Sequence, residues 1–146
     1  MRATGWKGAV AESAIVLAAT KLGVSVARPL SAAERYDLIF DVGSRLLRVQ
    51  CKSAVRRGDV IVVECHSARR TRDGYLKRCY TLDEVDAIAA YAADLDRCYF
   101  LPLDLCAGRS HVQLRLAPAR NNQKVGVHWA SAFEFEALDW NGVTGP

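Results

Sequence analysis

The sequence contains no run of apolar residues long enough to cross a membrane. No window approaches the roughly 18 uninterrupted apolar residues that a membrane span needs. The N-terminal stretch MRATGWKGAVAESAIVLAATKLG is interrupted by Glu12 and Lys21, and no cleavage-type site follows it. It therefore predicts a first helix and not a secretory signal. We expect a cytoplasmic protein with no membrane partner.

The sequence also lacks the paired cysteines of a disulfide framework or a zinc knuckle. Its five cysteines are odd in number and include no CxxC pair, and its three histidines stand at no ligand-like spacing. We expect the cysteines to be free buried thiols. Internal repeats, low-complexity tracts and inter-domain linkers are absent as well, so the sequence favours a single unit.

What is present suits one globular domain. The 146 residues are 51% apolar and 25% charged, which is enough for one buried core and lies outside the disordered range. We expect a single domain over residues 1–138 and a flexible tail over residues 139–146.

The net charge of +4 is unevenly distributed. The segment from Arg45 to Arg78 carries ten Lys or Arg residues and three acidic residues, so it is +7 while the rest of the chain is −3. A cationic segment on a slightly acidic body is typical of a protein that binds a polyanion. The alternative is a solvated charged face, which is the usual role of a charge run.

One helix and then several strands are expected in the first half of the chain. The helix is predicted over residues 7–22, and the strands over 24–26, 35–42, 45–52 and 59–65. Gly43-Ser44 between two of these runs predicts a hairpin, and residues 55–58 predict a basic turn.

The second half of the chain is less regular. Residues 67–80 are polar and basic and predict a mobile loop, whereas 85–93 fit either a helix or a buried strand. Further strands are expected over 99–102 and 112–116, followed by a polar connection over 118–124. We expect Trp129 and Phe133 to lie in the core.

Three side chains of different chemistry are predicted to converge at one end of the sheet. Asp37 lies near the start of one strand, and Gln50-Cys51-Lys52 is predicted to close the next. Gln50 and Lys52 share a face because strand side chains alternate. A carboxylate, an amide oxygen and an ammonium group suit phosphodiester hydrolysis, in which the carboxylate holds Mg²⁺ and the lysine positions a water.

These residues resemble a known family. Tyr36-Asp37-Leu38, the glycine hairpin and then Arg48-Val49-Gln50-Cys51-Lys52-Ser53 resemble the signature of the PD-(D/E)XK nucleases, in particular the small variant of group I intron homing endonucleases and Holliday-junction-resolvase-like proteins. Further blocks follow in the family's order and spacing: Lys7-Gly8 with Glu12, Tyr80 with Val85-Asp86, Tyr99 to Pro102, Arg115, Asn121-Asn122-Gln123 and Trp129-Ala130.

The resemblance implies an α/β fold, with a restriction-endonuclease-like mixed central sheet flanked by helices. It implies a metal-dependent DNA endonuclease in which Asp37, Gln50 and Glu12 hold Mg²⁺, with Mn²⁺ able to substitute, and Lys52 orients the attacking water. Two positions depart from the family pattern. Gln50 replaces the usual second acidic residue, which leaves one negative charge fewer, and Tyr36 replaces the usual proline.

The expected partner is double-stranded or branched DNA. Asn121, Asn122 and Gln123 carry amides that can read adenine edges, although consecutive Asn residues also favour a tight turn. A double-strand cut needs two active sites, so a homodimer or tetramer is expected. The candidate phosphate contacts, which give affinity without sequence information, are Arg56, Arg57, Arg69, Arg70, Arg72, Lys77 and Arg78.

Each candidate residue also has a plain structural interpretation. Asp37 is able to cap a hairpin, Lys52 and Gln50 can be ordinary polar residues of a strand, and Glu12 can be an exposed helix residue. Because Gln50 replaces an acidic residue, an alternative interpretation is a nuclease-derived module that binds DNA or RNA without cutting it.

Overall fold

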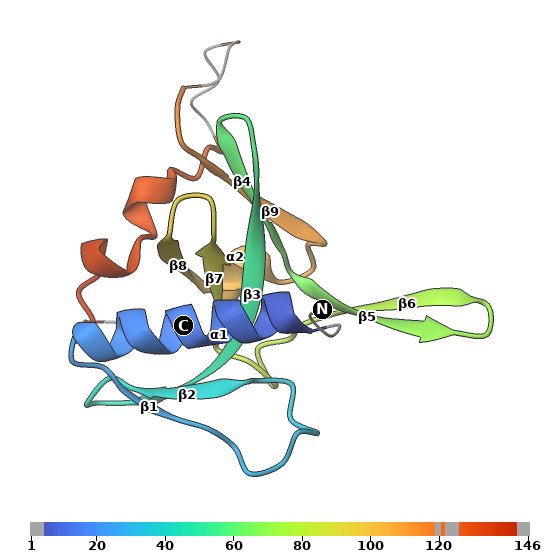
Figure 1. Ribbon diagram of the computed structural model, residues 1–146, viewed down its shortest axis with the longest axis horizontal. Coiled ribbons are helices and arrows are strands. Elements are labelled where there is room, and N and C mark those ends of the chain that lie inside the picture. The colour runs from blue at the N-terminus through green and yellow to red at the C-terminus, as the bar shows by residue number, and fades with distance from the viewer. Residues whose placement is uncertain (1–4, 119–120, 122–125, 143–146) are drawn as a thin grey trace.

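The structure is a computed structural model, and it describes residues 5–118, 121 and 126–142. A seven-stranded sheet forms its centre, one long helix crosses a face of that sheet, and a separate two-stranded hairpin projects from the body (Figure 1). Among the described residues, no helix has the length and apolar character needed to cross a membrane.

The chain runs through one helix and six strands before it returns to the centre of the sheet. The elements, in chain order, are α1 (Trp6–Lys21), β1 (Ser25–Ala27), β2 (Leu38–Asp41), β3 (Leu46–Arg57), β4 (Val60–Glu64), β5 (His66–Thr71), β6 (Gly74–Cys79), β7 (Ala87–Ala92), β8 (Arg97–Pro102), α2 (Leu103–Cys106), β9 (His111–Arg115) and two 3-10 turns, η1 (Ala130–Ala132) and η2 (Phe135–Ala137).

Strand β3 is the centre of the sheet. Its first third pairs antiparallel with β2, its middle pairs parallel with β7, and its last three residues pair antiparallel with β4. The outer pairs β1–β2, β4–β9 and β7–β8 are all antiparallel. The predicted α/β class with a mixed sheet is confirmed. Of the flanking helices, α1 is long, whereas α2 has only four residues.

The structure corrects the predicted end of β3. The strand continues for 12 residues to Arg57, so Gln50 and Lys52 lie in its middle and not at its end. Val55 pairs with Val62 and Arg57 with Val60, which makes the predicted basic turn part of the ladder. The arginines are tolerated there because the strand end is exposed, and only the last residue of the predicted turn, Gly58 with a φ of 60°, lies in the observed turn.

The predicted mobile loop over residues 67–80 is also wrong. It forms the hairpin β5–β6, with six backbone pairs from His66↔Cys79 to Thr71↔Gly74. Most of its side chains are exposed, so the sequence shows no apolar alternation that would have marked a strand. The ambiguous segment over 85–93 is the almost fully buried strand β7, whose alanines leave room for close packing.

The sheet separates two apolar clusters. On the α1 side, Ile15 and Ala19 pack against Phe40 and Phe100, and the ring of Trp140 joins this cluster. Trp140, which belongs to the predicted tail, is thus partly buried against this cluster, and residues 143–146 of that tail lie outside the described residues. On the other side, Ile61, Ile88 and Leu101 pack beneath α2, and Phe133 packs against them as expected. Trp129, also expected in the core, is 40% exposed.

A buried ion-pair network fixes β3 to the start of β7. The side chain of Asp86 is 9% exposed, and its Oδ2 accepts hydrogen bonds from the backbone N of Arg48 at 2.7 Å and from Arg48 Nε at 3.1 Å. Its Oδ1 accepts from Arg48 Nη2 and Arg45 Nη2. Burial raises the pKa of Asp86, but these hydrogen bonds outweigh burial and the pKa of Asp86 is lowered.

We expect Asp86→Asn to lower the free energy of unfolding by about 1–3 kcal/mol at pH 7, because two arginines lose their charged partner. Because the pKa of Asp86 is lower in the folded state, its carboxylate stabilises the fold at pH values above its unfolded-state pKa of about 3.9. This stabilisation is lost as the pH falls through the folded-state pKa. The difference between wild type and variant should therefore narrow in acid. Urea unfolding at pH 7 and in acid measures both effects.

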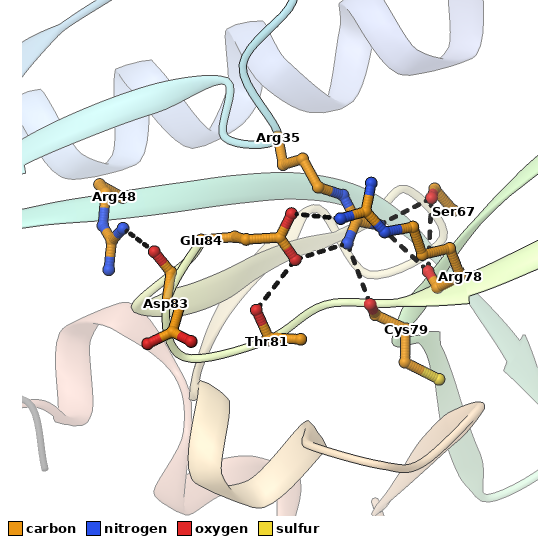
Figure 2. Close-up of polar contacts among 8 residues, drawn as sticks. All are labelled: Arg35, Arg48, Ser67, Arg78, Cys79, Thr81, Asp83 and Glu84. Atoms are coloured by element: carbon orange, nitrogen blue, oxygen red, sulfur yellow. Dashed lines mark hydrogen bonds and ion pairs between the residues drawn. The ribbon is translucent and has the colours of Figure 1, made fainter.

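Asp83→Asn is the matched control, because Asp83 contacts Arg48 through its backbone oxygen and not through its carboxylate (Figure 2). Equal stability of the two variants at pH 7 would contradict the structural role of Asp86.

Candidate functional site

Asp37 is fixed at the edge where β2 begins. The β2–β3 register pairs Leu38 with Val49, and its extension by one residue places Asp37 opposite Gln50. The backbone N of Asp37 donates to Val49 O at 2.9 Å, and its carboxylate Oδ2 accepts from the backbone N of Cys51 at 3.0 Å. One carboxylate oxygen is thus bound to the neighbouring strand.

Gln50 and Lys52 lie on β3, the strand next to Asp37. Cys51 packs with the α1-side cluster and Ala54 with the opposite one, as the alternation of strand side chains requires. Gln50 is half-buried, and its Nε2 donates only a long bond, 3.4 Å, to Cys51 O. The structure therefore places Asp37 on one strand and Gln50 and Lys52 on its neighbour, in the middle of the sheet and not at the predicted end.

The ammonium group of Lys52 is held at the junction of β4 and β5. Its Nζ donates to the backbone oxygen of His66 at 2.9 Å and lies 5.2 Å from the centre of the Tyr80 ring. One of the three N–H groups is thereby engaged, and the remaining two are available to a ligand.

Glu12 lies on α1 and forms an ion pair with Arg28, which follows β1. Arg28 and Asp37 line the same cleft, together with Pro29 and Tyr36. The positive charge of Arg28 also lowers the pKa of Asp37. A guanidinium group therefore lies near both carboxylates of the predicted metal site.

The pKa of Asp37 is raised above its ordinary value. Burial is the largest cause, and it outweighs the hydrogen bond from Cys51 and the charges of Lys52 and Arg28, all of which lower the pKa. The fold thus holds a carboxylate in a place where ionisation is unfavourable without further positive charge.

The oxygen donors near Asp37 are few. Within the described ranges, no three His, Cys, Asp or Glu side chains gather as a metal-binding group. Asp37 and Gln50 nevertheless offer the hard oxygen atoms that Mg²⁺ and Mn²⁺ prefer. They fit such an ion with two donors, and Glu12 joins them only if Arg28 releases it.

A cationic cleft lies next to Lys52. Lys7 at the start of α1, Lys52 and Arg57 line it, with Glu64 and His111 on its other side. Ser53 Oγ donates to Lys7 O at 3.4 Å, which joins the helix to β3 at this point. Arg56 is exposed beside it and donates to Gly58 O. Lys7 was not among the predicted contacts.

The remaining predicted DNA contacts divide into three groups. Arg69, Arg70, Arg72 and Lys77 are exposed on the β5–β6 hairpin. Arg78 forms an ion pair with Glu84 at 2.8 Å, so it is not a free phosphate ligand (Figure 2). Asn121 is exposed in a turn, as one of its two interpretations predicts, and Asn122 and Gln123 lie outside the described residues.

Sequence reasoning missed the residues that support the site. The guanidinium of Arg35 lies 4.2 Å from the centre of the Tyr80 ring, whose neighbour is Lys52. Arg35 also donates to Glu84 and to the backbone of the hairpin. These partners lie more than 40 residues apart in the chain, and no local pattern marks such a contact.

Comparison with known proteins places this geometry in context. Residues 3–136 match the family model described as PD-(D/E)XK endonuclease. A solved structure of a bacterial homing endonuclease, I-Ssp6803I, is similar at 28% sequence identity and a TM-score of 0.73, and the match covers 91% of this chain and 89% of that chain. No curated protein matches the chain. The likeness confirms the expected restriction-endonuclease-like arrangement.

We expect Asp37→Asn to raise the stability of the metal-free protein at pH 7. A raised folded-state pKa means that the wild type loses stability as the pH rises from the unfolded value of about 3.9 through the folded value. The variant carries no such group, and its amide oxygen still accepts from Cys51. The gain in the free energy of unfolding should therefore vanish below that unfolded value, as urea titrations across the pH range will show.

Asp41→Asn is the control, because Asp41 is exposed on the same strand and its Oδ1 accepts from Gly43 N in a way that an amide reproduces. A variant at position 37 that is less stable than wild type at neutral pH would show that the carboxylate serves the fold.

Proposed function

The chain belongs to the PD-(D/E)XK endonuclease family, and from that premise we propose that it is a metal-dependent endonuclease that hydrolyses phosphodiester bonds of DNA. The observation that carries the proposal is the position of Asp37 opposite Gln50, with Lys52 two residues further along the same strand. A carboxylate, an amide oxygen and an ammonium group are thus held on adjacent strands by backbone hydrogen bonds.

Asp37 and Gln50 are the proposed metal-holding residues. A bound Mg²⁺ or Mn²⁺ would polarise the scissile phosphate and lower the pKa of the attacking water. Asp37 is suited to it because its Oδ2 is held by Cys51 N while burial favours a positive neighbour. Glu12 is the third proposed donor, and its use requires the Arg28 ion pair to open.

Lys52 is proposed to position the water and to stabilise charge on the phosphate. The bond from Nζ to His66 O fixes the amine, and its other two N–H groups can donate to a water and to a phosphate oxygen. The water oxygen would attack phosphorus in line and release one proton to solvent, the bond from phosphorus to the 3′ oxygen would break, and the 3′ oxygen would take up a proton from solvent. The products carry a 5′-phosphate and a 3′-hydroxyl.

The cleft beside Lys52 is the proposed seat of the scissile strand. Lys7 and Arg57 add positive charge to the cleft that Lys52 lines. Phosphates bound there release counterions, which gives affinity that falls with salt and is independent of sequence. We propose duplex DNA as the substrate and a homing-type specificity, which the similarity to a bacterial homing endonuclease supports. A branched, resolvase-type substrate is the alternative within the family.

A second candidate function is a DNA-binding module that does not cut. Two observations favour it: Gln50 removes one negative charge from the site, and Arg28 already neutralises Glu12. Both features lower the affinity of the site for a cation. RNA would be an alternative ligand of the cationic cleft beside Lys52.

We expect the wild type to cut supercoiled plasmid or a synthetic four-way junction in Mg²⁺ or Mn²⁺ and not in EDTA. Asp37→Ala and Lys52→Ala should each lower the rate about 100-fold or more, because each removes one element of the transition-state stabilisation. Gel analysis of nicked and linear products measures the rate. Asp41→Asn and Lys21→Ala, both at exposed positions, are the matched controls.

A parallel thermal melt with Mn²⁺ separates the two candidate functions. If the metal raises the melting temperature of the wild type, and Asp37→Ala abolishes that rise, the nuclease site is supported. Gln50→Glu should then show the same rise at a lower Mn²⁺ concentration. Duplex binding without cutting or metal stabilisation would favour the binding module, and a preference for RNA at matched salt would favour an RNA ligand.

We also propose that two copies act together, because one protomer offers one site and a duplex has two strands. Sedimentation of the chain with a bound duplex should show a dimer or tetramer. A single protomer per duplex at micromolar concentration, with both strands still cut, would contradict the paired arrangement.

A further inference from the structure

The β5–β6 hairpin is a largely exposed and basic part of the described chain. It forms a two-stranded sheet of its own and extends away from the body (Figure 1). Its 14 residues include five Lys or Arg and one acidic residue. Tyr75 is 72% exposed and Leu76 is 52% exposed near its tip. The side chains of such a projection bury little surface against the core, so they are available to a partner.

The base of the hairpin is anchored from two sides. Arg35, whose side chain is 14% exposed, donates to Ser67 Oγ at 2.8 Å and to the backbone oxygens of Arg78 and Cys79, and Glu84 holds Arg35 and Arg78 together (Figure 2). On the other side, His66 Nδ1 lies 2.9 Å from Ser110 O. The base of the β5–β6 hairpin, called the arm below, is therefore tied to the body by side-chain contacts on both sides.

The dimensions of the arm suit one groove of DNA. Six residues per strand at about 3.3 Å each extend about 20 Å. The major groove of B-DNA is about 12 Å wide and 8.5 Å deep and admits a two-stranded ribbon, whereas the minor groove is about half as wide. The His66 oxygen at the base of the arm binds Lys52, so the arm starts at the proposed site of cleavage.

The two faces of the ribbon differ. The register pairs Arg70 with Tyr75 and Ala68 with Lys77, so Arg70, Tyr75 and Lys77 share one face. Within the part of the chain that the structure describes, these three side chains make no hydrogen bond or ion pair. The opposite face presents Arg69 beside Leu76, with Arg78 already paired to Glu84. The first face thus holds more unused hydrogen-bond donors.

We propose that the β5–β6 hairpin enters the major groove of duplex DNA and that Arg70, Tyr75 and Lys77 contact base edges there. The inference rests on the proposed function and adds sequence recognition to it. Arg and Lys are suited to the O6 and N7 acceptors of guanine, and the hydroxyl of Tyr75 both donates and accepts. Arg69 on the opposite face is left to contact the DNA backbone.

The test uses duplexes that the wild-type chain selects from a random-sequence library in EDTA, where no cutting occurs. On a selected duplex, methylation of guanine N7, in the major groove, should block binding at one or two positions. Arg70→Ala should bind at least about tenfold more weakly and lose the block at one guanine, and Lys77→Ala should act similarly. Arg69→Ala, its neighbour on the other face, should keep the methylation pattern and lose at most about threefold.

Three outcomes would overturn the inference: no consensus sequence after selection, equal effects of Arg69→Ala and Arg70→Ala, or interference only at adenine N3 in the minor groove. Plasmid cleavage that requires Asp37 would in each case leave the proposed function intact. A wild type that neither binds nor cuts any duplex would overturn both. Thermal unfolding of the exposed-site variants confirms that they are folded.

Discussion

The backbone hydrogen bonds of β3 are the constraint on which the rest of the molecule depends. This one strand pairs with β2, β7 and β4 along successive parts of its length, so it joins the hairpin with Asp37 to the parallel strand and to the second half of the sheet. The Arg48–Asp86 ion pair then fixes β3 to the start of β7. Gln50 and Lys52 lie in the middle of the same strand, so the pairing of the sheet sets the positions of their backbones.

The electrostatics of the site are incomplete without a ligand. Burial disfavours the ionised form of Asp37, and Arg28 neutralises Glu12 instead of a bound cation. On the other side, Lys7, Lys52 and Arg57 gather positive charge around one cleft. A cation at Asp37 and a phosphate in this cleft, as proposed above, would complement these charges.

Sequence reasoning predicted which residues face each other on adjacent strands better than it predicted the residues that support them. Asp37, Gln50 and Lys52 were predictable because a glycine-containing turn between two apolar runs fixes a register, and the register brings their positions together. The length of β3 and the β5–β6 hairpin were not, since their exposed arginines hide the period of two that marks a strand. The Arg35, Tyr80 and Glu84 contacts join segments far apart in the chain, so they emerge only from the packed structure.

The bond between Lys52 Nζ and the His66 oxygen makes the first residue of the arm a neighbour of the reacting groups. The hairpin proposed to read the DNA sequence and the lysine proposed to position the water would then be linked by one hydrogen bond. A target on which the arm seats poorly would shift that oxygen and, with it, the amine, so a mismatch would slow the reaction even when the complex forms. Fidelity in such an enzyme would be a property of the turnover rate as much as of the equilibrium affinity.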